Sequence, residues 1–154
     1  MTSGMLTLRG AHPDEAAALT ELCLRSKAVW GYDAAFMAAC RDELTLTPET
    51  FGSSLLQVAV RDGRVIGMVQ VRIAGEVAQL DRLFVEPDQL RSGAGRILLD
   101  WAKAAARQVG AVVMIIEADP GAAGFYRREG AVDAGTVASG SIPGRCIPKL
   151  SLAL

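Results

Sequence analysis

The chain has 154 residues, 51% of them apolar, and a formal net charge of −1 at pH 7. This length predicts a single domain, residues 1–154, with enough apolar side chains for a core. The near-neutral charge and the lack of a basic run exclude a broad nucleic-acid interface. The longest aliphatic run is far shorter than the roughly 20 residues of a membrane span, and the first residues do not form a secretion signal. We therefore expect no nucleic-acid or membrane partner and a cytoplasmic location.

The cysteines and the histidine offer little metal chemistry. Cys23, Cys40 and Cys146 are widely spaced and include no Cys-x-x-Cys pair. That spacing favours free thiols in a reducing cytosol over a disulfide framework or a zinc site. His12 has no second histidine with which to bind a metal. We therefore expect no metal.

The N-terminal third predicts one strand followed by two helices. Residues 5–11 alternate between apolar and polar, as a short strand does. Residues 12–30 and 33–44 have helical patterns, the second with Asp33 as a plausible N-cap. Residues 45–54 are expected to be a connector without regular structure.

The middle of the chain predicts an antiparallel meander. Residues 55–60, 65–73 and 78–85 each have the composition of a strand, and the Asp62-Gly63 pair between the first two is a strong hairpin signal. Simple alternation along the third strand predicts two faces, which are Leu80, Arg82 and Phe84 on one side and Asp81, Leu83 and Val85 on the other.

The last third predicts an alternation of helices and strands. Residues 94–109 are helical, and Gly110 is a good C-terminal stop. Residues 111–118 then have the pattern of a buried strand, and residues 119–130 contain a short helix. Two closing strands are expected at 131–139 and 149–154.

A glycine-rich loop precedes the helix that starts at Ala94. Gly93 and Gly95 stand where free backbone N–H groups and the positive end of the helix dipole would attract an anion such as phosphate. A plain tight turn is the competing interpretation. A Rossmann loop would need a third glycine where Leu98 stands, and a Walker loop would need Gly-Lys-Ser/Thr, which is absent. The remaining phosphate site is the pyrophosphate cradle of acyl-CoA enzymes.

Two motifs make the sequence similar to the GNAT superfamily of acyl-CoA-dependent N-acetyltransferases. The stretch LRSGAG, residues 90–95, resembles the family's Gln/Arg-x-x-Gly-x-Gly/Ala loop, with Leu90 at its first position. The stretch ADPGAAGFYRREGA, residues 118–131, resembles its Asn-x-x-Ala-x-x-Phe-Tyr-x-x-x-Gly segment, with Asp119 where asparagine is common. Residues 26–49 and 139–148 are similar to a branch of small bacterial acetyltransferases. The resemblance covers nearly the whole chain.

The resemblance implies a fold and a reaction. The fold would be α/β (α+β), with a mixed, mainly antiparallel central sheet of about seven strands flanked by about four helices. The reaction would move an acetyl group from acetyl-CoA, as cosubstrate, to a primary amine of a small molecule or peptide by direct attack. Such attack requires an amine that has lost its proton, donors for the oxyanion, and a proton for the leaving thiolate.

The resemblance also assigns residues to these tasks. Tyr126 would give the proton to the thiolate, and Asp81 is the best-placed base, with a salt bridge to a nearby arginine as its competing role and Glu117 as a weaker candidate base. Trp30, Tyr32 and Arg145 are candidates for the acceptor pocket, with core positions for Trp30 and Tyr32 and a plain turn at residues 141–145 as the competing interpretations. The acetyl-CoA site would comprise Leu83, Phe84, Val85, Leu90, Arg91, Ser92, Gly93, Ala94, Gly95, Arg96, Asp119, Ala122 and Phe125.

A second function of a different class stays open. A non-catalytic acyl-CoA-binding or regulatory domain would keep the fold without the chemistry, and Leu90 together with the lack of a clear base fits it. Many members of the superfamily pair through their C-terminal strands, so the resemblance also implies a homodimer.

Overall fold

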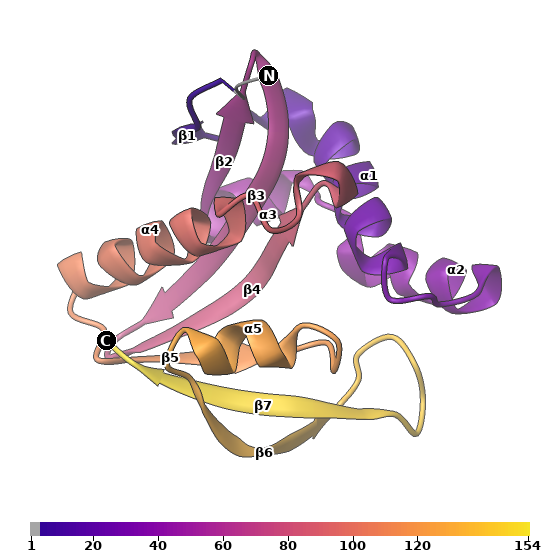
Figure 1. Cartoon of the computed structure of the whole chain (residues 1–154). Coiled ribbons are helices and arrows are strands. Elements are labelled where there is room, and N and C mark those ends of the chain that lie inside the picture. Colours follow the sequence, from indigo (N-terminus) through magenta and orange to yellow (C-terminus); the bar gives the residue numbers. More distant parts are fainter. Residues whose placement is uncertain (1–3) are drawn as a thin grey trace.

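The computed structural model describes residues 4–154, which form one seven-stranded sheet in the order β1-β2-β3-β4-β5-β7-β6 (Figure 1). All neighbouring strands are antiparallel except β4 and β5, which run parallel. The strand bounds are β1 Thr7–Gly10, β2 Leu55–Arg61, β3 Arg64–Ala74, β4 Val77–Val85, β5 Val113–Glu117, β6 Val132–Ala138 and β7 Cys146–Ala153. The predicted mixed, mainly antiparallel sheet is confirmed.

Five helices cover the two faces of this sheet. They are α1 Ala16–Ala28, α2 Ala34–Leu44, α3 Pro48–Ser53, α4 Ala94–Gln108 and α5 Ala123–Arg128, with short 3-10 turns at Pro13–Glu15 and Pro87–Gln89. Apolar residues of α4 and α5 share one core with β3, β4, β5 and β7. Apolar residues of α1 and α2 form a second core against the opposite face of β2 and β3. Among residues 4–154, no helix is both long and apolar enough to cross a bilayer.

The two parallel strands separate partway along their length, and this opening creates the site. β4 pairs with β5 only from Val77 to Leu80, opposite Val113–Ile116. Beyond Leu80, β4 continues to Val85 alongside β3 alone. In Figure 1 the upper part of β4 runs away from β5, and α5 lies below the opening.

A bulge in β4 corrects the predicted faces of that strand. Gln70 pairs with Arg82 and Val71 with Leu80, so Asp81 is the extra residue of the bulge. The inserted residue reverses the alternation, so Leu80 packs in the same core as Leu83 and Val85 rather than on the face of Arg82 and Phe84. Simple alternation could not predict this, because a bulge leaves no compositional signal in this strand.

Other differences concern the ends of elements. The stretch predicted as a connector contains α3, which begins at Pro48 behind an N-cap at Thr47 whose N–H donates to Thr50 Oγ1 (3.0 Å). This helix makes five where about four were expected. β7 begins at Cys146 rather than at residue 149. By contrast, the Asp33 cap is confirmed, since its carboxylate accepts the N–H of Phe36 (2.8 Å).

Candidate active site

The N-terminus of α4 forms an open cradle of backbone donors. Its N-cap, Gly93, has a φ of +88°, and nothing lies within 4 Å of where a Cβ would be. Among residues 4–154 no side chain caps this helix, so the N–H groups of its first turn, at the positive end of the helix dipole, have no side-chain partner there. At Gly95 an added Cβ would make only an ordinary contact, 3.5 Å from the ring of Phe125, so crowding does not require a glycine there. Together these features suit an anion.

A groove of about 610 Å³ leads from this cradle toward the opening between β4 and β5. Leu83 and Val85 of β4 form one wall, and Phe125 of α5 forms another. Three arginines, Arg91, Arg96 and Arg128, add positive charge along it. Of these, Arg96 lies 3.5 Å from Glu129, whereas Arg91 and Arg128 have no carboxylate partner among residues 4–154. The groove therefore fits a long ligand with several negative charges.

A second cavity, of about 150 Å³, lies on the other side of the opening. Its walls come from α1, α2, the middle of β4, the end of β5, and the segment between β6 and β7. The residues that line both cavities are Trp30, Leu83, Ala122 and Tyr126. The two cavities therefore adjoin at these four residues, which is where ligands bound in them would approach each other.

Tyr126 stands at this junction. Its side chain is buried, with 6% of the residue exposed, and its ring packs edge-on against Phe125 at 5.1 Å. Burial raises the pKa of this phenol above its ordinary value of about 10. Tyr126 therefore stays protonated at neutral pH and retains a proton that it can donate.

The backbone of β4 offers donors beside Tyr126. In an antiparallel ladder, the N–H groups of alternate residues point to the paired strand. Glu86 donates its N–H to the carbonyl of Ile66 (2.8 Å), so by alternation the N–H groups of Leu83 and Val85 point away from β3. Val85 N–H reaches Ser26 Oγ at 3.4 Å. Leu83 N–H is thus directed toward the opening, as an oxyanion or amide donor must be.

The two candidate bases differ in whether another side chain holds the carboxylate. Asp81, on the β4 bulge, is held by both its oxygens in an ion pair with Arg72. Glu117, at the end of β5, has no ion-pair or hydrogen-bond partner for its side chain within the described part of the chain. Both line the second cavity. The salt bridge considered for Asp81 is therefore present, and Glu117 is the freer carboxylate.

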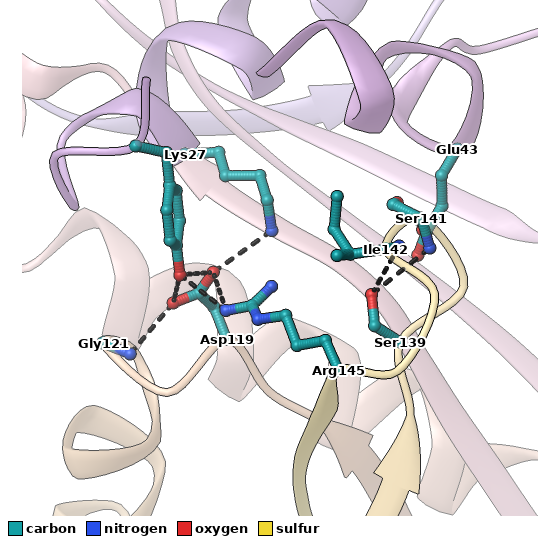
Figure 2. A network of polar contacts seen from close by, with 9 residues as sticks. Lys27, Glu43, Asp119, Gly121, Ser139, Ser141, Ile142 and Arg145 are labelled. Carbon is teal, nitrogen blue, oxygen red and sulfur yellow. Dashed lines mark hydrogen bonds and ion pairs between the residues drawn. The ribbon is translucent and has the colours of Figure 1, made fainter. Parts of the chain in front are cut away.

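Asp119 joins three separate parts of the chain in a cluster with Lys27, Tyr32 and Arg145 (Figure 2). Its carboxylate accepts from Lys27 Nζ (3.1 Å), from Tyr32 OH (2.8 Å) and from the N–H of Gly121 (2.9 Å). Arg145 donates to Tyr32 OH (2.7 Å) and lies 3.8 Å from Asp119. Burial by itself raises the pKa of Asp119, but these donors outweigh it and lower that pKa.

The structure brings most of the sequence-predicted residues to these two cavities. The groove contains the predicted acetyl-CoA residues Leu83, Val85, Leu90, Arg91, Gly93, Gly95, Arg96, Ala122 and Phe125. Phe84 and Asp119, predicted in the same group, line the second cavity instead. Ser92 is exposed and Ala94 buried, and neither lines a cavity. Trp30 lines both cavities and Arg145 lines the second, whereas Tyr32 lines neither and contacts the second cavity through Asp119 and Arg145.

Several site residues were not predicted from the sequence, and three of them bear on the chemistry. Lys27 contacts Asp119 across 92 positions of sequence, and Arg128 lines the groove from the end of α5. Gly121 lies under Trp30, since a Cβ there would be 2.6 Å from the indole ring. Gly121 and Arg128 both lie inside the second motif, at positions that the motif does not specify, whereas Lys27 lies outside both motifs. Across residues 4–154, no group of three or more His, Cys, Asp or Glu could hold a metal ion.

Comparison with known proteins gives the same architecture. The chain superposes over its full length on 99% of a GCN5-related N-acetyltransferase from Rhodopseudomonas palustris, with a TM-score of 0.79 and 21% identity. Over 97% of the chain it matches 99% of the PaiA N-acetyltransferase from Thermoplasma acidophilum in complex with coenzyme A, with a TM-score of 0.78 and 16% identity. The ribosomal-protein-S18-alanine N-acetyltransferase from Escherichia coli gives a TM-score of 0.72 at 18% identity, over 97% of this chain and 94% of that one.

At these identities the superpositions show a common fold. None of the curated proteins compared matches the chain by sequence. The model of the Acetyltransferase (GNAT) family, in contrast, matches residues 20–131, which contain the glycine loop, the β4 bulge and Tyr126. The resemblance seen in the two motifs is confirmed, and the chain belongs to the acetyltransferase (GNAT) family.

Proposed function

We propose that this protein transfers an acetyl group from acetyl-CoA to a primary amine of a small molecule or peptide. The observation that carries this proposal is the meeting of the two cavities at Tyr126 and Leu83. One cavity begins at a cradle for an anion, and the other is smaller and has charged side chains such as Glu117 and Arg145 in its lining. Two substrates that enter from opposite sides can react directly at such a junction, without a covalent enzyme intermediate.

The groove residues fit coenzyme A. The open space at Gly93 and the unpaired N–H groups of α4 would hold the pyrophosphate, and Arg91 and Arg128 would add charge. Leu90 replaces a polar residue at the loop's first position, so that position contributes an apolar contact instead. Acetyl-CoA would supply a thioester whose carbonyl lies near Leu83 N–H.

Each group at the junction has a task in the transfer. The amine nitrogen attacks the thioester carbonyl carbon, and the N–H of Leu83 stabilises the oxyanion that develops. As the carbon–sulfur bond breaks, Tyr126 donates its phenolic proton to the sulfur. The proton that the amine must lose goes through water to a carboxylate. Glu117 is the acceptor without an ion-pair partner among residues 4–154. Asp81 is the second candidate, because it also lines the cavity although Arg72 holds its carboxylate.

Replacing Tyr126 with phenylalanine tests this assignment. The change removes only the hydroxyl, so we expect kcat to fall by about 100-fold or more, while calorimetry shows unchanged affinity for acetyl-CoA. The assay is release of free CoA with a panel of primary amines. Equal turnover by the variant would contradict the role given to Tyr126.

The alternative is a non-catalytic acyl-CoA-binding or regulatory domain. The ion pair between Asp81 and Arg72, which occupies the first candidate base, favours it. If the wild type binds acetyl-CoA but acetylates no amine of the panel, this alternative replaces the enzyme. If the folded wild type does not bind acetyl-CoA, both functions are wrong. The three unpaired cysteines fit the cytoplasmic location proposed with either function.

A further inference from the structure

We infer that the acceptor carries a carboxylate as well as its amine, and that Arg145 and Lys27 bind this carboxylate. The inference rests on the proposed acetyl transfer and names the class of its second substrate, an amino-carboxylate. It comes from the balance of charges in the cluster around Asp119 (Figure 2).

Two cations share one carboxylate in this cluster. Lys27 and Arg145 both face Asp119, and neither has another ion-pair partner in residues 4–154. The three side chains are mostly buried, with exposures of 16% for Lys27, 20% for Arg145 and 11% for Asp119. Burying a charge without a partner is costly. The cluster by itself therefore has one positive charge in excess at the wall of the acceptor cavity, where an anionic group of a substrate would compensate it.

Lys27 and Arg145 also have more N–H donors than the contacts within the cluster use. Arg145 uses one terminal nitrogen for Tyr32 OH, and Lys27 uses one N–H for Asp119. A guanidinium group has five donors and an ammonium three. The remaining N–H groups are sufficient to bind both oxygens of a carboxylate, an arrangement for which the planar guanidinium group is well shaped.

Stacking holds the Arg145 guanidinium in place before any ligand arrives. Its central carbon lies 5.2 Å from the ring centre of Tyr32 and 4.9 Å from that of Phe36, and the two rings stack at 3.9 Å. Tyr32 is in turn fixed by both oxygens of Asp119. A preorganised cation loses little entropy on binding, which favours a recognition role.

The acidic groups of the same cavity lie on other elements. Asp81 is on the β4 bulge and Glu117 ends β5, whereas Lys27 comes from α1 and Arg145 from the segment before β7. A third cation of the lining, Arg82 on β4, donates to Gln70 Oε1 and to the carbonyl groups of Glu43 and Thr45. Glu43 binds Ser141 in the separate group shown in Figure 2. A substrate with an amine at one end and a carboxylate at the other matches this separation of charge. Its amine then lies toward the strands and the base.

The test compares each acceptor with its own carboxamide. Free amino acids, β-alanine and 4-aminobutyrate are assayed for acetylation against the corresponding amides, which have nearly the same shape but no negative charge. We expect at least one amino acid whose kcat/KM exceeds that of its amide by about tenfold or more. The amide has the less basic amine, so this preference would not come from easier deprotonation.

Variants then locate the preference. Arg145→Gln should bring the ratio of the two kcat/KM values close to one, because it lowers kcat/KM for the amino acid and not for its amide. Arg145→Lys should keep part of the preference for the amino acid. Arg107→Gln, which removes an exposed cation from α4, is the matched control and should leave the ratio unchanged. An equal loss for acid and amide in Arg145→Gln would show a purely structural cluster and overturn the inference.

A binding measurement separates this inference from the proposed function. Each acid and amide is titrated by calorimetry into the protein saturated with free CoA, where no transfer can occur. Tighter binding of an acid, abolished by Arg145→Gln, supports the inference even if no amine is ever acetylated. If no acid binds better than its amide and none is acetylated faster, the inference is wrong, whatever other amine the protein acetylates.

Discussion

Some side chains at this site hold separate segments of the chain together, in addition to any part they take in the chemistry. Asp119 ties the end of α1, the Tyr32 loop and the segment before β7 to the loop that precedes α5. An asparagine at this position would keep the shape of the side chain, but one of the two acceptor oxygens would become an NH2 donor, and Lys27 and Arg145 would be left without any carboxylate. The departure from the usual motif therefore has a physical reason in this chain.

The Asp119→Asn variant should be less stable than the wild type at neutral pH, by about 1–3 kcal/mol. The pKa of Asp119 is lowered in the folded state, so its contribution is fully present above the unfolded pKa of about 3.9 and is lost as pH falls below it. Urea unfolding at pH 7 and near pH 3 measures both effects. The difference between variant and wild type should shrink at the lower pH.

Asp133→Asn is the control for this experiment. Asp133 also pairs with an arginine, Arg127, but its side chain is 65% exposed. An exposed pair contributes little to stability. A loss as large as that in Asp119→Asn would show that any paired aspartate behaves this way, and would contradict the special position of Asp119.

Among the elements, α4 combines a structural and a binding task. Its apolar face carries Leu98 and Leu99 into the core, and its N-terminus supplies the cradle. The glycines at its two ends have similar backbones, with φ of +88° at Gly93 and +96° at Gly110, and open space around both. A substitution at Gly110 is therefore a matched control for the same substitution at Gly93.

Gly93→Glu should abolish detectable acetyl-CoA binding in calorimetry, because the new carboxylate would occupy the cradle and repel phosphate. Gly110→Glu introduces the same charge and the same strained backbone at the far end of α4, which is exposed and lines neither cavity. That variant should bind like the wild type. Similar losses in both would attribute the effect to strain and would leave the anion cradle unsupported.

The core role of α4 gives a prediction about stability. Leu98 is fully buried, so Leu98→Ala should lower the free energy of unfolding by about 2–5 kcal/mol. Its neighbour Ile97 is 42% exposed, and Ile97→Ala should have a clearly smaller effect. Denaturant unfolding monitored by circular dichroism measures both. Equal effects would contradict the packing of α4 on the sheet.

For the whole molecule, the exposed edge of the sheet bears on whether two copies of the chain associate. The sheet ends at β6, whose outer edge has no partner strand in residues 4–154. Val132 on that strand is 63% exposed. Unpaired edges bind other strands readily, so the homodimer implied by the resemblance stays a prediction, and β6 is the proposed contact.

Sedimentation velocity tests this prediction. We expect the wild type to sediment as a dimer and Val132→Lys to weaken the dimer by about tenfold or more, because two like charges would meet at the edge. Val112→Lys, at a position 55% exposed before β5, is the control and should not change association. A monomeric wild type at high micromolar concentration would show that the pairing does not occur.

The sequence by itself determined whatever depends on local chemistry. Hydrophobic periodicity located every strand and the long helices, and the spacing of Gly93 and Gly95 before an amphipathic helix predicted an anion site where the groove begins. The Phe125-Tyr126 pair was recognised from its motif. These signals are readable because each arises from residues within about one turn or one strand of one another.

Only the tertiary structure decided how distant residues meet. The β4 bulge changed the face of Leu80, and the separation of β4 from β5 joined two cavities at Tyr126. Lys27 and Arg145 came to share Asp119, although Lys27 lies 92 positions before it and both α5 and β6 lie between Asp119 and Arg145. The charge balance and the shape of a cavity depend on several segments that come together only in the folded protein. The spacing of residues along the sequence does not show which segments these are.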